Sequence, residues 1–306
     1  MEMKAGDAST PGQSTATSGP GLSLTDVSLF MMAAIWGVNF VVVKYATGVL
    51  PLLPFNAVRV TMAALILLLI ASLGRTPWPD RRTILMLLGL GVLGNGVYQM
   101  LFINGIARTR AGDASLLIAA TPAFIALLGR ARGTERIGGR GWIGILMSIA
   151  GIALVSGAAA LVQTNSALVG DALILAAALC WAFYTVLLKP YMHGVDGVKL
   201  SAITMAGGAM SLMLYGLPEV VATNWGAAPA SAYFALVYSG LGGLVVAYLF
   251  WYRGVRLIGP TRTAMYSNLQ PIFAVAVAWM VLGEIPTPWQ GIGAASIMSG
   301  LLLTRT

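Results

Sequence analysis

GIARTRAGDASLLIAATP at residues 105–122 and GVRLIGPTRTAMYSNLQP at residues 254–271 are two related stretches that decide how this chain is organised. Each opens on a glycine and ends on a proline, and one offset of 149 residues relates both ends. A second pair, WGVNFVVVK at 36–44 and WAFYTVLLK at 181–189, recurs at an offset of 145 residues. Matches that recur in the same order indicate an internal duplication.

The amino-acid composition places this duplicated chain in a membrane. Of its 306 residues, 58% are hydrophobic and 9% are charged, and the mean hydropathy is +0.84; soluble domains carry about 25% charged residues. An α-helix needs about 20 apolar residues to cross the hydrocarbon core. Ten windows approach that length, and we therefore predict an all-α polytopic membrane protein with ten transmembrane helices. The windows are 25–46, 55–74, 83–106, 113–130, 140–161, 168–188, 198–218, 231–252, 262–283 and 288–304.

The duplication divides the ten windows into two halves of five. We predict a first five-helix repeat over 25–161 and a second over 162–306. Residues 1–24, rich in Gly, Ser, Thr and Pro, are predicted to form a disordered cytoplasmic tail. Because five is an odd number, the second repeat must insert upside down relative to the first. Inverted repeats are a transporter architecture in which the substrate site lies between the halves, here expected around a central cavity.

The positions of the basic residues predict the orientation, because Lys and Arg are retained on the cytoplasmic side. With the N-terminus inside, fourteen of the 18 Lys and Arg residues fall on the inner side, three fall on the outer side, and one lies within a window. We predict a multi-pass protein of a bacterial-type inner membrane with both termini in the cytoplasm. The same distribution explains the net charge of +8 without nucleic-acid binding, since no basic stripe could follow a phosphate backbone.

Residue types that serve catalysis are scarce. The single histidine, His193, is predicted to lie in a loop, and the single cysteine, Cys180, lies within an apolar run. Asp26, Asp113 and Asp171 fall at predicted helix starts, where carboxylates cap free N–H groups. We therefore predict no enzyme, no metal site and no cofactor. A missing carboxylate in the middle of the windows also argues against strict ion coupling and against cationic drugs as the main cargo.

Aromatic and amide side chains recur on the inner faces of several windows. In the third window, Asn95, Tyr98, Gln99 and Phe102 form one helical stripe. Amides and phenols are costly in hydrocarbon without partners, so we expect them to line a substrate cavity. For any single residue, helix–helix packing is an equal alternative. The predicted substrate-binding set is completed by Trp36, Asn39, Trp181, Tyr184, Tyr248, Trp251, Asn268 and Gln270, whereas Tyr252 is expected in an interfacial aromatic belt.

Three basic residues and several small residues lie near membrane depth. Arg59 sits near the outer end of the second window, where it could pair with a substrate carboxylate or extend to the interface. Lys44 and Lys189 end their windows, and for all three basic residues a structural role is expected first and gating second. A ridge of small residues permits close helix contact, either between the halves or in a dimer, so monomer and homodimer stay open. The ridge comprises Gly144, Ser148, Gly151, Gly291 and Ala295.

These motifs resemble the EamA-type branch of the drug/metabolite transporter superfamily. The matching features are W-x-x-N-F-x-x-x-K in the first window, the segment from Pro54 to Arg59, a TP and a QP pair in the fourth and ninth windows, and LGE at 282–284. The first-half counterpart of LGE departs from the pattern, with Arg132, Gly133 and Thr134 before Glu135, which leaves the end of the fourth helix open. The resemblance implies ten helices and alternating access, and the aromatic inner faces look most like YddG-type amino-acid exporters.

We predict an alternating-access transporter that exports small amphipathic metabolites across the inner membrane, with neutral or aromatic amino acids favoured. Its partners would be a small-molecule substrate and the lipid bilayer. The alternatives are a multidrug or nucleotide-sugar type transporter and a non-transporting membrane scaffold. A nucleotide sugar carries phosphates, and the predicted cavity set contains no Lys or Arg to pair with them.

Overall fold

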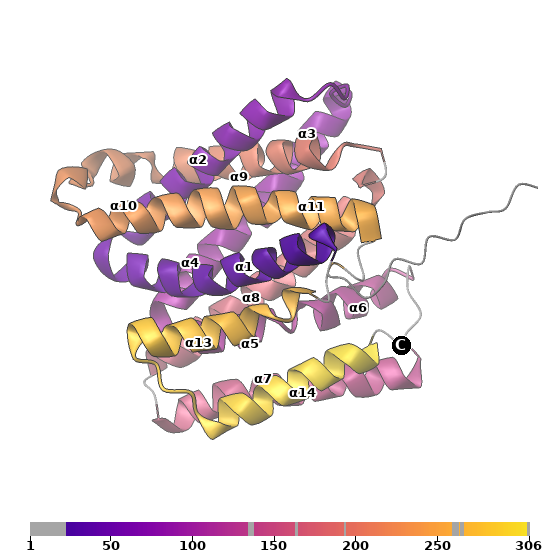
Figure 1. Ribbon diagram of the computed structural model, residues 1–306, viewed down its shortest axis with the longest axis vertical. Helices are drawn as coiled ribbons and strands as arrows, with labels where there is room; N and C mark the ends of the chain where they lie inside the picture. Colours follow the sequence, from indigo (N-terminus) through magenta and orange to yellow (C-terminus); the bar gives the residue numbers. More distant parts are fainter. Residues whose placement is uncertain are drawn as a thin grey trace, which may run out of the picture.

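The computed structural model describes residues 23–133, 138–162, 165–192, 194–258, 263 and 266–304. The predicted tail, His193 and Glu135 lie outside the described residues, apart from Ser23 and Leu24. Regular structure in the described ranges is helical throughout, and Figure 1 shows the helices running roughly parallel to one another across the view. This arrangement is what a bilayer requires, because each helix satisfies its own backbone hydrogen bonds.

The first half contains the helices that correspond to the first five predicted windows. They are α1 (Leu24–Val49), α2 (Leu52–Leu73), α3 (Arg81–Gly91) continuing through a π-helical segment (Val92–Val97) into α4 (Tyr98–Arg108), α5 (Ala111–Ile118) followed by α6 (Thr121–Ala131), and α7 (Gly139–Val162).

The second half repeats this order. It comprises α8 (Asn165–Leu188), α9 (Gly197–Ala222), α10 (Ala230–Val237) continuing through a π-helical segment (Tyr238–Val246) into α11 (Ala247–Ile258), then α13 (Gln270–Leu282) and α14 (Pro288–Thr304). In the described part, seven of these continuous helices are long and apolar enough to cross a membrane. The prediction of an all-α membrane protein is thereby confirmed.

Polar residues mark where several helices begin. The Ser23 hydroxyl accepts from the Asp26 N–H, and the Asp26 carboxylate accepts from the Ser23 N–H, which forms a capping box at α1. Asp80 and Asp196 cap α3 and α9 through their carboxylates. Hydrogen bonds from the Thr83 side chain and backbone hold the pKa of the Asp80 carboxyl below its usual range. Each cap therefore marks the start of a new apolar helix.

The two halves run in opposite directions. Lys44, near the end of α1, donates from Nζ to the Ala107 carbonyl near the end of α4, at 3.0 Å. Thr109, just after α4, donates to the Asp171 carboxylate near the start of α8, at 2.5 Å. Thus α1 ends where α8, its repeat mate, begins, as an inverted repeat requires. We call this end of the bundle, where α13 turns into α14 in Figure 1, the Glu284 end.

Small residues bring α7 and α14 into close contact, and the two helices lie side by side at one edge of the bundle (Figure 1). A Cβ atom added to Gly151 would lie 2.7 Å from the Gly293 carbonyl oxygen. On α14, Gly291 and Ala295 of the predicted ridge are exposed, and Gly293 and Gly300 contact α7 instead. The α7 part of the ridge therefore packs against the second half. A dimer contact through the exposed Gly291 and Ala295 stays a prediction.

This contact predicts that Gly151→Leu destabilises the protein. The added side chain would meet the backbone of α14, and overpacking of this kind costs about 1–3 kcal/mol. Thermal unfolding in detergent should show a midpoint several degrees below that of the parent. The matched control is Gly291→Leu, because a Cβ at Gly291 meets nothing within 4 Å. Equal midpoints for the two variants would contradict the contact.

Candidate substrate-binding site

An aromatic cluster lies where helices of both halves meet. The ring of Trp181 in α8 is at its centre, with its centroid 5.0 Å from Tyr98 of α4 and 6.3 Å from Tyr248 of α11. The Tyr184 ring, one turn along α8, lies 5.0 Å from Trp181. The cluster comprises Trp36, Phe40, Tyr98, Phe102, Trp181, Tyr184, Tyr248, Trp251 and Tyr252.

Trp36 extends the cluster onto α1. Its ring centroid lies 5.9 Å from Tyr248 and 5.9 Å from Trp251. Its Nε1 donates to the Gly243 carbonyl at 2.9 Å, an oxygen in the second π-helical segment. Segments of π-helix alter the normal backbone bonding and recur at functional sites. The indole therefore ties the aromatic cluster to this segment.

The structure brings seven of the predicted binding residues into this cluster. They are Trp36, Tyr98, Phe102, Trp181, Tyr184, Tyr248 and Trp251. Two further members were not in the predicted set. Phe40 lies four residues after Trp36 and contacts Phe102 edge to face at 5.5 Å, and Tyr252 lies four residues after Tyr248. Helical spacing was the signal for both residues.

The aromatic-belt expectation for Tyr252 is wrong. Its ring contacts Tyr248 at 6.4 Å and faces Gly197 at the start of α9, where an added Cβ would lie 3.2 Å from the ring. Gly197 has no side chain and leaves space for the Tyr252 ring. The position of Tyr252 near a helix end does not predict this contact.

Three predicted amides are buried beside the cluster. Gln99 accepts from Nη2 of Arg59 at 2.6 Å. Asn39 is covered by Gly243, and its Oδ1 has no hydrogen-bond partner in the described part of the chain. Asn95 lies in the first π-helical segment, against the backbone of Gly208 in α9. Asn95 therefore packs between helices, and helix–helix packing is the alternative role expected for any single residue of the set.

Asn268 and Gln270 lie at the start of α13. Asn268 precedes the helix, Gln270 begins it, and the Gln270 carbonyl lies against Gly37 of α1. Across the described ranges, no hydrogen bond joins either side chain to the cluster. Their place in the predicted set rests on the sequence alone.

Arg59 is buried in α2 rather than extended toward an interface. Its side chain is 1% exposed. Its Nε donates to Asn56 Oδ1 at 3.1 Å, and its guanidinium carbon lies 5.5 Å from the centre of the Phe55 ring. The expectation that it could extend to the interface is therefore wrong. Gly240 of the second π-helical segment packs on the α2 backbone here, where an added Cβ would lie 3.1 Å from the Arg59 carbonyl oxygen.

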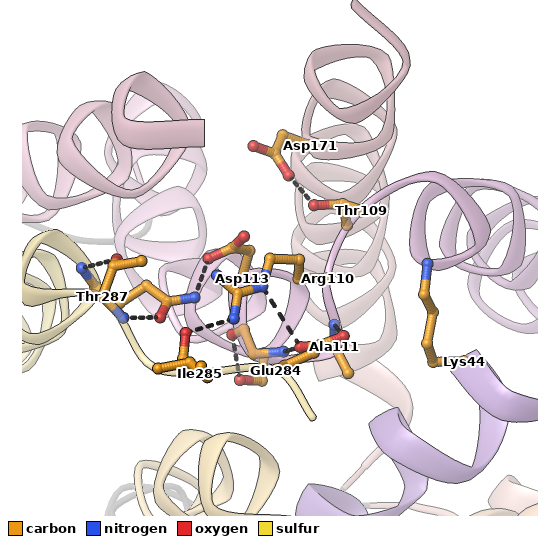
Figure 2. Close-up of polar contacts among 12 residues, drawn as sticks. Lys44, Thr109, Arg110, Ala111, Asp113, Asp171, Glu284, Ile285 and Thr287 are labelled. Atoms are coloured by element: carbon orange, nitrogen blue, oxygen red, sulfur yellow. Dashed lines mark hydrogen bonds and ion pairs between the residues drawn. The ribbon is translucent and has the colours of Figure 1, made fainter. Parts of the chain in front are cut away.

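At the Glu284 end, one carboxylate joins the halves, and Figure 2 shows the contacts. Glu284 accepts from the backbone N–H of Ala111 at 3.0 Å and of Gly112 at 3.2 Å. It also lies 3.9 Å from Nε of Arg110, whose Nη2 donates to the Ile285 carbonyl at 2.7 Å. Since α5 has no side-chain cap of its own, a residue of the second half caps a helix of the first.

A glycine sets the direction of Glu284. Gly283 ends α13 with φ +66°, a left-handed conformation that favours glycine. The described residues contain a second such glycine, Gly133 with φ +69°, directly after α6 and its cap residue Arg132. The fourth predicted helix therefore ends at Ala131, close to the predicted boundary. The first-half copy has one more residue between its glycine and its glutamate than the second-half copy.

Of two neighbouring aspartates predicted at helix starts, Asp113 does lie in the first turn of α5, whereas Asp171 does not begin a helix. Asp171 is buried seven residues into α8, because that helix begins at Asn165, and it accepts from Thr109. Asp113 accepts from Nε2 of Gln290 in α14 at 2.6 Å. Both carboxylates therefore cross between helices, whereas the capping prediction holds for Asp26.

Two hollows of the described chain lie outside the aromatic cluster. One of about 450 Å³ opens between α4 and α9 and is lined by Met100, Asn104, Ser211 and Tyr215, among others. Another of about 460 Å³ lies at the Glu284 end, between Pro51 and Thr223. The rings of the aromatic cluster contact one another in this conformation. None of the described His, Cys, Asp and Glu residues groups in threes that could hold a metal ion.

Comparisons with known proteins agree with this architecture. A sequence profile described as the EamA-like transporter family matches residues 23–157 and again residues 168–306. A crystal structure superposes with a TM-score of 0.66 at 16% identity, covering 93% of this chain and 99% of that one, which supports the fold alone.

Several relatives align over most of their length. The chain is 26% identical to the uncharacterized transporter YyaM of Bacillus subtilis, over 87% of this chain and 88% of that protein. It is 29% identical to a probable terminal-alkyne amino-acid exporter of Streptantibioticus cattleyicolor, over 90% and 91%. It is 27% identical to a probable amino-acid metabolite efflux pump of Salmonella typhimurium, over 89% and 92%.

The Glu284 contacts predict a ranked loss of stability. Glu284→Ala leaves two N–H groups of α5 without their acceptor and should cost about 1 kcal/mol, within the range of roughly 0.5–2 for lost helix caps. Glu284→Gln keeps one acceptor oxygen and should cost less. The measurement is the unfolding midpoint in detergent, and Glu219→Ala, at an exposed site in α9, is the control. The assignment of Glu284 as the cap of α5 fails if both Glu284 variants have the same unfolding midpoint as the control.

Proposed function

The chain belongs to the EamA-like transporter family of the drug/metabolite transporter superfamily, and on this premise we propose that it exports small amphipathic metabolites, above all neutral or aromatic amino acids. Family membership makes the protein a transporter rather than an enzyme or a membrane scaffold. The observation that carries the cargo proposal is the aromatic cluster, which combines rings of α1 and α4 with rings of α8 and α11. Such a meeting place of two inverted halves is where transporters of this plan bind substrate.

The chemistry of the cluster suits an amino acid with a large apolar side chain. Ring stacking adds about 0.5–1.5 kcal/mol beyond burial. The neighbouring amides Asn39 and Gln99 can hydrogen-bond polar groups without imposing a net charge. Two relatives carry names that include amino-acid export, which supports the same cargo class. Multidrug and nucleotide-sugar cargo are the alternatives that an uptake panel distinguishes.

Alternating access gives the aromatic cluster a role in this proposal. In the described conformation Trp181 contacts rings from three positions, so cargo must separate those rings to bind between the halves. Separating the rings breaks ring–ring contacts, and contacts between the rings and the cargo then replace them. We therefore expect weak binding and broad selectivity, as release of cargo requires.

Transport by purified protein in liposomes tests the cargo class. We expect uptake of neutral aromatic amino acids, and we expect Trp181→Ala and Tyr98→Ala to lower that uptake about three- to tenfold, the equivalent of about 0.5–1.5 kcal/mol of lost stacking. Tyr215→Ala is the control, because Tyr215 is a large aromatic residue of α9 that is 72% exposed.

Two results would contradict the cargo proposal. If both cluster variants transport at the parent rate with unchanged monodispersity, the rings serve packing alone. If the parent moves cationic dyes or nucleotide sugars and no amino acid, the cargo class is one of the alternatives.

We also propose an inner-membrane location with both termini in the cytoplasm, on the distribution of Lys and Arg residues. A fluorescent protein fused after Thr306 should then be bright in the cytoplasm of a bacterial host. A phosphatase that works only in the periplasm should be inactive at the same position. An active phosphatase fusion, at normal membrane levels of the protein, would reverse the orientation.

A further inference from the structure

Arg59 is a cation buried at membrane depth without an acidic partner. It is the eighth residue of α2, so it lies roughly 10 Å along the helix from its start, inside a hydrocarbon core about 30 Å thick. A charge at such depth is costly unless an opposite charge or several hydrogen bonds compensate it. Its hydrogen-bond partners in the described chain are the amide oxygens of Asn56 and Gln99.

All described carboxylates are placed elsewhere. Asp26 bonds to Tyr266, Asp113 to Gln290, Asp171 to Thr109, and Glu284 to Arg110 and the start of α5. Asp80 and Asp196 cap their helices, and Glu219 is exposed in the last turns of α9. Arg110 and Glu284 form an ion pair with each other. The protein therefore supplies no described counter-charge to Arg59.

The surroundings of Arg59 contain a buried polar atom without a partner. Nδ2 of Asn56, the residue whose Oδ1 accepts from Arg59, has no hydrogen-bond partner among the described residues. Gln99, which accepts from the guanidinium, directly follows Tyr98 of the aromatic cluster in α4. A cation, an unpaired amide nitrogen and an aromatic ring thus lie together between α2 and α4.

We propose that Arg59 is the carboxylate-binding residue of the transport site and that the protein selects cargo bearing one carboxylate. The proposal rests on the transport function above and names the chemical group that the cargo must carry. A guanidinium has five N–H donors in a planar fork that fits a carboxylate with two parallel hydrogen bonds. In the unliganded protein, the amide oxygens of Asn56 and Gln99 occupy the place of those two carboxylate oxygens.

The same geometry limits the cargo. One guanidinium balances one negative charge, which fits a carboxylate better than a phosphate dianion. No described carboxylate faces the cluster, so nothing charged there requires the ammonium group of an amino acid. The carboxylate is therefore the required group, and the ammonium is dispensable.

Three probes with one side chain test this in liposomes loaded for counterflow. L-phenylalanine carries both groups, 3-phenylpropionate carries only the carboxylate, and L-phenylalaninamide carries only the ammonium. With the parent protein, the two carboxylates should compete with labelled L-phenylalanine, and the amide should compete at least about tenfold more weakly, as expected for a lost charge-assisted hydrogen bond.

Substitutions at the site separate anchoring from packing. Arg59→Gln should abolish the preference for carboxylate over amide, whereas a merely structural role would weaken both competitors equally and keep their ratio. Gln99→Glu is the second variant, since it places a carboxylate on the guanidinium with little change in shape. Gln99→Glu should raise the unfolding midpoint and suppress competition by L-phenylalanine and by 3-phenylpropionate. Arg108→Gln, at an exposed arginine of α4, should behave as the parent.

The outcomes distinguish this proposal from the proposed function. If the parent transports L-phenylalanine but the amide competes equally well, the anchor is wrong and amino-acid transport stands. If labelled 3-phenylpropionate is taken up and L-phenylalanine is not, the anchor stands and the proposed cargo is wrong. If Arg59→Gln does not stay monodisperse, Gln99→Glu decides, and unchanged competition in that variant overturns the proposal.

Discussion

The absence of hydrogen-bond partners in the hydrocarbon core is the constraint on which the rest of this structure depends. Backbone groups meet it by forming helices, which is why every regular element of the described chain is helical. Side chains meet it only by turning toward other helices. Arg59 on Gln99, Asp171 on Thr109 and the Trp36 indole on a π-helical carbonyl are three solutions to one problem. Polar groups are therefore concentrated between the helices, and any group there without a partner is conspicuous.

The duplication makes the two halves alike in plan and different in detail. The third helix of each half contains a π-helical segment at the same place in the repeat. Each segment places a glycine against the other half: Gly94 lies against Tyr184, and Gly240 lies against the Arg59 backbone. Gly133 and Gly283 end equivalent helices with the same left-handed turn. Glu135 and Glu284 keep the 149-residue offset of the repeat, whereas Gly133 and Gly283 are 150 residues apart.

Hydrophobicity predicts which segments are helices, and helical spacing predicts which side chains share a face. These two signals predict the helical segments and seven of the nine aromatic residues of the cluster. They fail where the answer depends on a neighbour. Arg59 is turned inward toward Gln99 of α4, a partner that hydrophobicity does not reveal. Gly291 and Ala295 belong to the predicted ridge, but Gly293 and Gly300 are the glycines of α14 that contact α7. Asp171 does not lie at a helix start, because α8 begins at Asn165.

The cap of α5 also has a consequence for biosynthesis. Its acceptor, Glu284, follows Ala111 by 173 residues, so a ribosome must complete nine of the ten windows before the contact can form. Until then the first N–H groups of α5 must bond to water, lipid headgroups or a chaperone. A fragment that ends between the halves would keep those donors open indefinitely. The first half is therefore an incomplete folding unit, and the two halves would have to be made together, or meet promptly in the membrane, to become a finished protein.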